Sequence, residues 1–207
     1  MSAYHVPMEA DCIYPIYSRA VGQEKLFKYE DNYRFFLIKF KFHINPIADT
    51  FAWCLLPNHF HFLIKVKSFD SIKSYYTAVK EKGNFSAEFL SDFIMERFSN
   101  WLNNYTKSFN KVYERKGGLF IDYMRRVQVQ GDEQFSATIF YIHKNPVHHG
   151  LVKKLEDWKW SSYKSFFSNR ETSLQKDEVI DMFHGIEAFA AFHQQTVYLK
   201  NAVVTED

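Results

Sequence analysis

Cysteine, glycine and proline are all scarce in this sequence. Its 207 residues include two Cys, seven Gly and five Pro. The two cysteines, Cys12 and Cys54, lie in no metal-type spacing, which excludes a disulfide scaffold and a zinc site held by paired cysteines. No internal repeat or low-complexity segment is present either. From the cysteine usage we expect reduced thiols and a cytoplasmic protein.

Long apolar runs are missing as well. No stretch approaches the roughly 20 apolar residues that a membrane-spanning helix needs. The N-terminal stretch carries Glu9 and Asp11 and lacks the basic-then-apolar pattern of a signal peptide. We therefore expect no membrane association. The composition, 46% hydrophobic and 24% charged, is typical of a globular protein, and most of the 22 Phe and 13 Tyr are expected in its core.

Charge is distributed unevenly along the chain. Residues 107–164 carry 11 Lys and Arg against 6 Asp and Glu, whereas residues 165–207 carry 3 against 7. The basic middle segment also holds His143, His148 and His149. Such a segment could face the phosphates of a nucleic acid. The alternative is an ordinary solvated basic surface, and charge alone does not separate the two.

Hydrophobic periodicity and turn residues predict alternating strands and helices. Strands are predicted over residues 13–17, 52–56, 60–66 and 119–129. Helices are predicted over residues 30–42, 68–79, 86–109 and 133–143, with one or two more within 177–195. This order favours an α+β fold, in which a ferredoxin-like antiparallel sheet carries helices on one face and a helical C-terminal extension follows. Pro15 in the first strand predicts an edge position or a bulge.

The longest predicted helix carries an aromatic stripe. Aromatic residues recur there at multiples of four, namely Phe85, Phe89, Phe93, Trp101, Tyr105 and Phe109. We expect this stripe to be core, with a face for a homodimer as the second choice.

Two histidines stand one residue apart after a tight Pro57-Asn58 turn. Because side chains alternate along a strand, His59 and His61 share one face, about 6–7 Å apart along the strand. The intervening Phe60 belongs to the other face. The hairpin is thus expected to pack one face on a core and to present two imidazoles on the other. Imidazole is the commonest side-chain metal ligand, so a metal site is one interpretation; two strand histidines without a function are the other.

A tyrosine and an asparagine four residues apart lie in the predicted helix that ends near Pro146. Tyr141 and Asn145 share a helix face at this spacing. The phenol oxygen of Tyr141 could attack a metal-held phosphate, and the amide oxygen of Asn145 could be a third metal ligand. Taken alone, the pair could equally be a core aromatic and a helix cap. Pro146 is expected to kink or end the helix.

Taken together, these features resemble the single-tyrosine HUH transposases. The stretch from Leu56 to Ile64 resembles their histidine–hydrophobic–histidine motif. Four further stretches resemble the REP-associated subfamily: its tyrosine-helix signature at 141–152, its aromatic–serine box at 158–163, its glycine turn at 117–120, and its first strand and loop, with Arg19, at 14–27. The resemblance covers roughly residues 10–167.

The resemblance implies a ferredoxin-like domain that cleaves and rejoins single-stranded DNA beside hairpins. His59 and His61 would hold a divalent metal, Mg²⁺ or Mn²⁺, and Asn145 would be the third ligand. Tyr141 would be the nucleophile, leaving a 5′-phosphotyrosine intermediate. Glutamine takes the place of Asn145 in many insertion-sequence relatives.

Basic residues near these motifs are the candidate DNA contacts. They are Arg19, Arg125, Arg126 and Lys144. Arg125 and Arg126 fall on opposite faces of a predicted strand, so only one of them can face a given ligand.

The predicted domain division places the catalytic domain at residues 1–167 and an acidic helical extension at 168–207. A domesticated relative that binds hairpin DNA without cutting it is the alternative function. A zinc hydrolase is a third, but no second H-x-H or H-x-x-E-H pattern supports it. The position of Tyr141 relative to His59 and His61 separates the enzyme from the binding protein.

Overall fold

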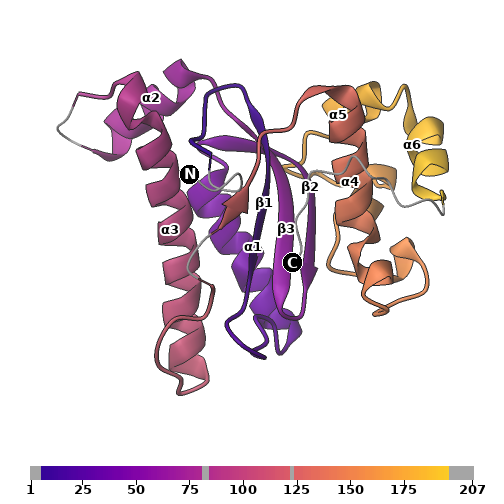
Figure 1. Cartoon of the computed structure of the whole chain (residues 1–207), viewed down its shortest axis with the longest axis horizontal. Coiled ribbons are helices and arrows are strands. Elements are labelled where there is room, and N and C mark those ends of the chain that lie inside the picture. Colours follow the sequence, from indigo (N-terminus) through magenta and orange to yellow (C-terminus); the bar gives the residue numbers. More distant parts are fainter. Residues whose placement is uncertain (1–5, 81–83, 122–123, 196–207) are drawn as a thin grey trace.

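Four strands and six α-helices make up the part of the chain that the computed structural model describes, residues 6–80, 84–121 and 124–195 (Figure 1). The strands are β1 (Ile13–Arg19), β2 (Ala48–Leu56), β3 (His59–Val66) and β4 (Arg125–Arg126). The helices are α1 (Glu30–Ile44), α2 (Phe69–Val79), α3 (Ala87–Val112), α4 (Gly131–His148), α5 (Lys176–Met182) and α6 (Ile186–His193). Two 3₁₀ turns, η1 (Leu155–Asp157) and η2 (Tyr163–Phe167), follow α4.

The four strands form one antiparallel sheet in the order β2-β3-β1-β4. Along the chain the elements run β-α-β-β-α-β, with α2 and α3 together in the second helical position. This is the ferredoxin-like arrangement. The predicted α+β class and antiparallel sheet are therefore confirmed, and so is the hairpin of β2 and β3 around Pro57 and Asn58.

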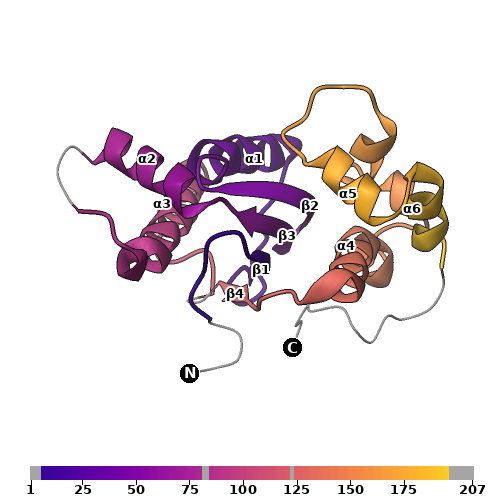
Figure 2. The ribbon, with the colours of Figure 1, turned by 90° about the horizontal axis from the view of Figure 1, so that it is seen from above.

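Helices cover both faces of the sheet, which corrects the expectation that they lie on one. Figure 2 shows α1 and α3 on one side and α4, α5 and α6 on the other. Two separate hydrophobic cores result, one on each face. The reason is visible in β2 and β3, where nearly every residue is buried, as in strands covered on both sides. The alternation of histidine with phenylalanine in β3 had suggested one polar face.

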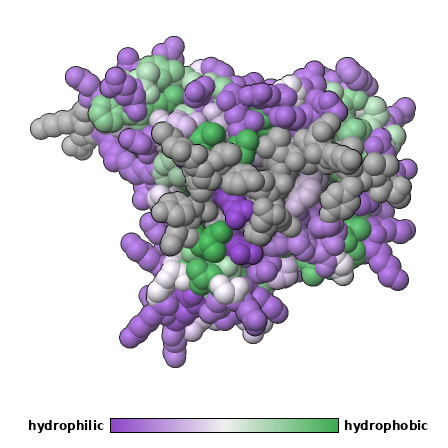
Figure 3. Space-filling model, in the orientation of Figure 1, coloured by the Kyte–Doolittle hydropathy of each residue, from purple (hydrophilic) through white to green (hydrophobic). Residues whose placement is uncertain are grey.

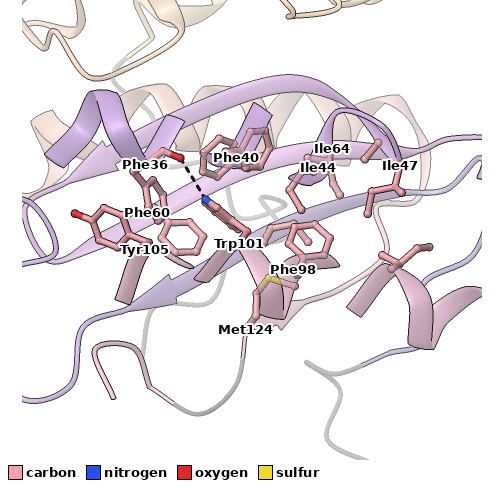
Figure 4. Packing of buried hydrophobic residues seen from close by; sticks show 14 of the residues in the cluster. Phe36, Phe40, Ile44, Ile47, Phe60, Ile64, Phe98, Trp101, Tyr105 and Met124 are labelled. Carbon is pink, nitrogen blue, oxygen red and sulfur yellow. Dashed lines mark hydrogen bonds between the residues drawn. The ribbon is translucent and has the colours of Figure 1, made fainter. Parts of the chain in front are cut away.

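The larger core surrounds Trp101 of α3, whose indole N–H donates to the carbonyl of Phe36 at 3.2 Å (Figure 4). Phe40 of α1 stacks on Phe62 of β3 with ring centroids 4.0 Å apart. Most of the predicted stripe on α3 is buried here, but Phe89 is 57% exposed. An α-helix has 3.6 residues per turn, so residues spaced four apart rotate gradually around the helix and do not all lie on the buried face.

The predicted strand over residues 119–129 is mostly irregular. Only Arg125 and Arg126 pair regularly with β1, and residues 122–123 lie outside the described ranges. The carbonyl of Ile13 accepts a hydrogen bond from the N–H of Val129, so the backbone groups of Ile13 point toward the irregular segment. Backbone groups two residues apart in a strand point to the same side, so the nitrogen of Pro15 points toward that segment too. A proline has no N–H to offer there. Pro15 thus lies in an internal strand, beside a gap in the ladder and not at an edge.

The outer edge of β2 is covered by the aromatic–serine stretch. The N–H of Leu55 donates to the carbonyl of Trp160 at 2.8 Å, and the N–H of Ser162 donates to the carbonyl of Trp53 at 2.9 Å. The Ser162 hydroxyl also accepts from the N–H of Trp53 at 2.9 Å. This pairing hides the backbone groups that an open edge would expose.

The second core joins the sheet to α4, α5 and α6. Phe189 of α6 and Val179 of α5 are fully buried there with Ile142 of α4. Part of the segment assigned to the acidic extension, up to residue 195, therefore packs in this core. Residues 196–207 lie outside the described part of the chain, and the boundary at residue 167 stays a prediction.

Within the described residues, no helix is long and apolar enough to cross a membrane. The face of the molecule in Figure 3 is mostly hydrophilic, and the hydrophobic residues visible on it form small separate patches.

Candidate active site

His59 and His61 point from β3 toward α4, away from the larger core. Their side chains share one face, as predicted, and their ring centroids are 5.3 Å apart with the rings perpendicular. Both residues are buried, with 6% and 2% of their surface exposed. The expectation of two presented imidazoles is thus corrected, because α4 packs over this part of the sheet.

Asn145 lies between the two imidazoles. Its Oδ1 is 3.2 Å from His59 Nε2, and its Nδ2 is 3.3 Å from His61 Nε2. Asn145 is almost fully buried, although the helix around it continues through Pro146 to His148. Of the predicted kink or end at Pro146, the end is not observed there, because the helix ends two residues later, at His148. The missing N–H of Pro146 removes the one hydrogen bond that it would donate to the carbonyl of Ile142.

Both ring nitrogens of His59 face amide oxygens. Nδ1 is 2.8 Å from the side-chain oxygen of Asn58, and Nε2 is 3.2 Å from Oδ1 of Asn145. Both oxygens only accept, so a neutral imidazole can donate to one of them. With the proton on Nδ1, the lone pair of Nε2 needs either a cation or the NH₂ group of Asn145, which a rotation of that amide would supply.

The donor set of these three side chains fits a divalent cation. Two imidazole Nε2 atoms and one amide oxygen converge on a small volume, and such N/O ligands suit first-row divalent ions. Among the described residues, no group of three His, Cys, Asp or Glu side chains gathers as a metal cluster. An ion at this place would therefore depend on the amide of Asn145.

Tyr141 lies one turn before Asn145 on the same side of α4. Its ring is 5.8 Å from the ring of His61, nearly perpendicular to it, and the residue is half-buried. The structure thus brings together the four residues that the sequence singled out, Tyr141, Asn145, His59 and His61. Tyr141 is therefore not buried elsewhere in the fold, which is what the enzyme interpretation requires.

Tyr17 is a neighbour that the sequence did not indicate. It stands opposite His61 in the pairing of β1 with β3, and its ring lies 4.8 Å from His61 and 5.9 Å from His59. It is buried, at 7% exposure. Only the register of β1 against β3 reveals this contact, and a single sequence does not give that register.

A cavity of about 520 Å³ opens beside His59. Arg19, Asn58 and His149 are among its lining residues. The ring of His149, which is exposed, lies 4.9 Å from that of His59. The cavity therefore connects one of the two histidines to solvent and places basic side chains around the entrance.

The four candidate DNA contacts separate into two pairs. Arg19 lines the cavity, and Arg125 stands opposite Tyr17 on the histidine face of the sheet. Arg126 belongs to the other face, where its Nε donates to the carbonyl of Val6 at 2.7 Å and burial lowers the pKa of its guanidinium. Lys144 lies over the ring of Phe140, 5.9 Å from its centroid, and lines a different pocket.

His143 does not face phosphate as the basic segment had suggested. It is completely buried, and its Nδ1 lies 2.9 Å from His193 Nε2 while its Nε2 lies 2.8 Å from the Ser162 hydroxyl. The chain of contacts ends at the carbonyl of Phe189, 2.8 Å from His193 Nδ1. It ties α4 to α6 and to the edge of β2. Burial lowers the pKa of His193 to about 4 and that of His143 well below its usual range.

Acid is expected to destabilise the fold through this histidine pair. The folded protein keeps His193 neutral down to about pH 4, whereas an unfolded histidine takes up a proton near pH 6.5. The contribution of His193 to the free energy of unfolding is complete above about pH 6.5 and is lost as the pH falls, on the order of 3 kcal/mol by pH 4. Urea unfolding at pH 7 and pH 4.5 measures the loss of this free energy. His193→Gln should flatten the profile, and exposed His184→Asn should not; equal profiles for all three proteins would contradict the assignment.

Comparisons with known proteins point to one family. No family model matches the chain. A protein of Haemophilus influenzae named as a REP-associated tyrosine transposase is 26% identical over 117 residues, which are 56% of this chain. The chain spans only 58% of the length of that curated relative.

A solved structure shares the fold. It is a REP-associated tyrosine transposase bound to a REP hairpin, with a TM-score of 0.60 and 18% sequence identity. The likeness covers 82% of this chain and 87% of the solved one. The resemblance to REP-associated tyrosine transposases, which the motifs indicated, is thus confirmed by a curated relative in sequence and by a solved structure in fold.

Proposed function

We propose that this protein cleaves and rejoins single-stranded DNA through Tyr141, with the help of a divalent metal. The observation that carries the proposal is the placement of Asn145 between His59 and His61, with Tyr141 one helical turn away. These four side chains, which lie together, would be the nucleophile and the metal ligands. The similarity to transposases supports a DNA-processing function in general.

The metal would be held by His59 Nε2, His61 Nε2 and the amide oxygen of Asn145. Mg²⁺ and Mn²⁺ accept such ligands and keep further coordination positions open. When bound, the ion would supply Lewis-acid polarisation of the scissile phosphate. The Asn58 oxygen, 2.8 Å from His59 Nδ1, would orient the first imidazole for this role.

Tyr141 would form the covalent bond to DNA. Its phenol oxygen attacks phosphorus and loses its proton, and the bond from phosphorus to the 3′ oxygen breaks. The 3′ oxygen takes up a proton and leaves as a hydroxyl, while the 5′ phosphate stays on the tyrosine. A 3′ hydroxyl can reverse the step and rejoin DNA without an external energy source, because the phosphotyrosine conserves the phosphodiester bond. Burial of the histidines by α4 would keep the reacting groups in fixed positions.

The substrate enters from the cavity beside His59. Arg19 lines this cavity, and Arg125 lies on the same face of the sheet, so both are proposed phosphate contacts. The solved relative is bound to a REP hairpin. We infer a similar substrate here, a hairpin with a single-stranded flank.

A nicking assay tests the proposal. A labelled hairpin oligonucleotide with single-stranded flanks is incubated with the protein in Mn²⁺ or in EDTA. Cleavage in Mn²⁺ and none in EDTA is the expected result. Binding of the hairpin without any cleavage would favour the alternative, a domesticated binding protein.

Binding is expected to prefer single-stranded flanks over plain duplex. The cavity is bordered by a few basic side chains and leads to a buried site, which a strand can enter and a blunt duplex cannot. Affinity should fall steeply with salt, as for other phosphate contacts. Fluorescence anisotropy with a flanked hairpin and a blunt duplex of equal length measures this. Equal affinity for both would count against the proposed substrate.

A further inference from the structure

A second pocket, of about 610 Å³, lies on the other side of α4. It is formed where α4, the 3₁₀ turns η1 and η2, and α6 meet. Four lysines are among its lining residues, Lys144, Lys153, Lys154 and Lys164, and Glu156 is the one carboxylate among the described residues that line it. We call it the lysine pocket. The described lining residues therefore carry more positive than negative charge.

Ion pairing distinguishes these lysines from three others on the surface. Lys65, Lys80 and Lys159 form ion pairs with glutamates at 2.6–3.0 Å. None of the four lysines of the pocket forms an ion pair within the described residues. Burial lowers the pKa of the His193 imidazole, and the positive charge of nearby Lys144 lowers this pKa further. Four cations around a hollow favour a ligand with several negative charges.

An aromatic residue is exposed at the same pocket. Phe167 is 49% exposed and lines it, and its ring lies 5.2 Å from that of Tyr163. An exposed aromatic beside lysines is the combination that binds single-stranded nucleic acid, in which bases stack while cations contact the backbone.

The chain itself connects the lysine pocket to the cavity beside His59. His149 and Leu151 line the cavity, and Lys153 lines the lysine pocket. Only Val152 lies between Leu151 and Lys153, so their Cα atoms are at most about 7 Å apart. The cavity and the lysine pocket are therefore close enough for one DNA strand to contact both.

We propose that the lysine pocket binds the phosphate backbone of the DNA single strand next to the segment that enters the cavity, with Phe167 as a surface for base stacking. This inference rests on the proposed function, since it extends the same substrate. It adds a second contact region, on the face of α4 that turns away from His61. Lys144, which lies away from His59 and His61, would contact phosphate in this pocket.

The test compares two charge-matched double variants. Lys153→Gln/Lys154→Gln removes two charges from the lysine pocket, and Lys107→Gln/Lys111→Gln removes two from α3 on the opposite face of the sheet. All four side chains are exposed, so both variants should keep the thermal midpoint of the wild type. Affinity for a single-stranded oligonucleotide is measured by anisotropy over a range of salt concentrations. The first variant should bind on the order of tenfold more weakly, with a salt slope smaller by about 1.4, and the second should bind like the wild type.

Phe167→Ala gives an independent readout. It should weaken binding of single-stranded DNA without changing the salt slope, because stacking releases no counterions. Unchanged affinity in the Lys153/Lys154 variant, or an equal loss in the Lys107/Lys111 variant, would overturn the proposal. So would an equal loss for blunt duplex, which would assign the pocket to double-stranded DNA. Absence of cleavage by the wild type, with the lysine effect intact, would instead refute the cutting function alone.

Discussion

Tyr141→Phe is expected to abolish the covalent protein–DNA adduct. The substitution removes only the phenol oxygen, so the ring against His61 and the packing of α4 remain. Loss of a nucleophile typically costs a factor of roughly 10³ or more in rate. Binding of the hairpin should persist within about twofold, since the hydroxyl is needed for the chemical step. Denaturing gel electrophoresis of protein mixed with labelled hairpin and Mn²⁺ measures the adduct.

Tyr17→Phe is the matched control. Tyr17 lies closer to His61 than Tyr141 does, with ring centroids at 4.8 Å against 5.8 Å, but it is more deeply buried and belongs to β1. The control variant should form the adduct. If instead Tyr17→Phe loses it and Tyr141→Phe retains it, the nucleophile is on β1 and our assignment is wrong.

Removing either strand histidine is the second change with a large expected effect. His59→Ala and His61→Ala each take away one of two imidazole ligands, so Mn²⁺ should bind much more weakly and cleavage should fall by roughly 10²-fold or more. EDTA should do the same to the wild type. Both histidines point away from the larger core, so the variants should fold, with a loss of about 1–3 kcal/mol for the polar contact left unmade to Asn145.

A thermal shift provides a readout apart from activity. Mn²⁺ should raise the midpoint of the wild type, because a ligand of the folded state stabilises it, and should not raise that of either variant. His43→Ala is the matched control: it also removes a buried imidazole, hydrogen-bonded to Arg97 and Asn104 on the other face of the sheet. Its Mn²⁺ shift should equal that of the wild type. Cleavage at the wild-type rate by a His59/His61 double variant would refute the metal site.

Local patterns were enough to predict the hairpin and the shared faces. The alternation at His59 and His61, and the four-residue spacing of Tyr141 and Asn145, depend only on the geometry of one strand and one helix. That α4 covers β3 is a long-range fact that periodicity could not supply, and the resemblance implied only that Tyr141 and Asn145 act together with the two histidines. Tyr17 shows the limit, because its place beside both histidines follows from pairing between distant strands.

Other features escaped prediction because they depend on tertiary contacts. Ser162 closes the edge of β2 and also meets buried His143, and neither contact leaves a periodic trace in the sequence. The segment 119–129 has strand-like residues, yet only Arg125 and Arg126 pair regularly with β1. Phe89 fits a stripe of fours but falls outside the true buried face.

Peptide mass mapping of the adduct tests the central claim most directly. Wild-type protein is incubated with a flanked hairpin in Mn²⁺, digested with nuclease and protease, and analysed for tyrosine peptides that carry a 5′-linked nucleotide. We predict one modified site, Tyr141, present with Mn²⁺ and absent with EDTA. A modified site at another tyrosine, or cleaved DNA with no modified peptide, would contradict the placement of Tyr141 as the nucleophile.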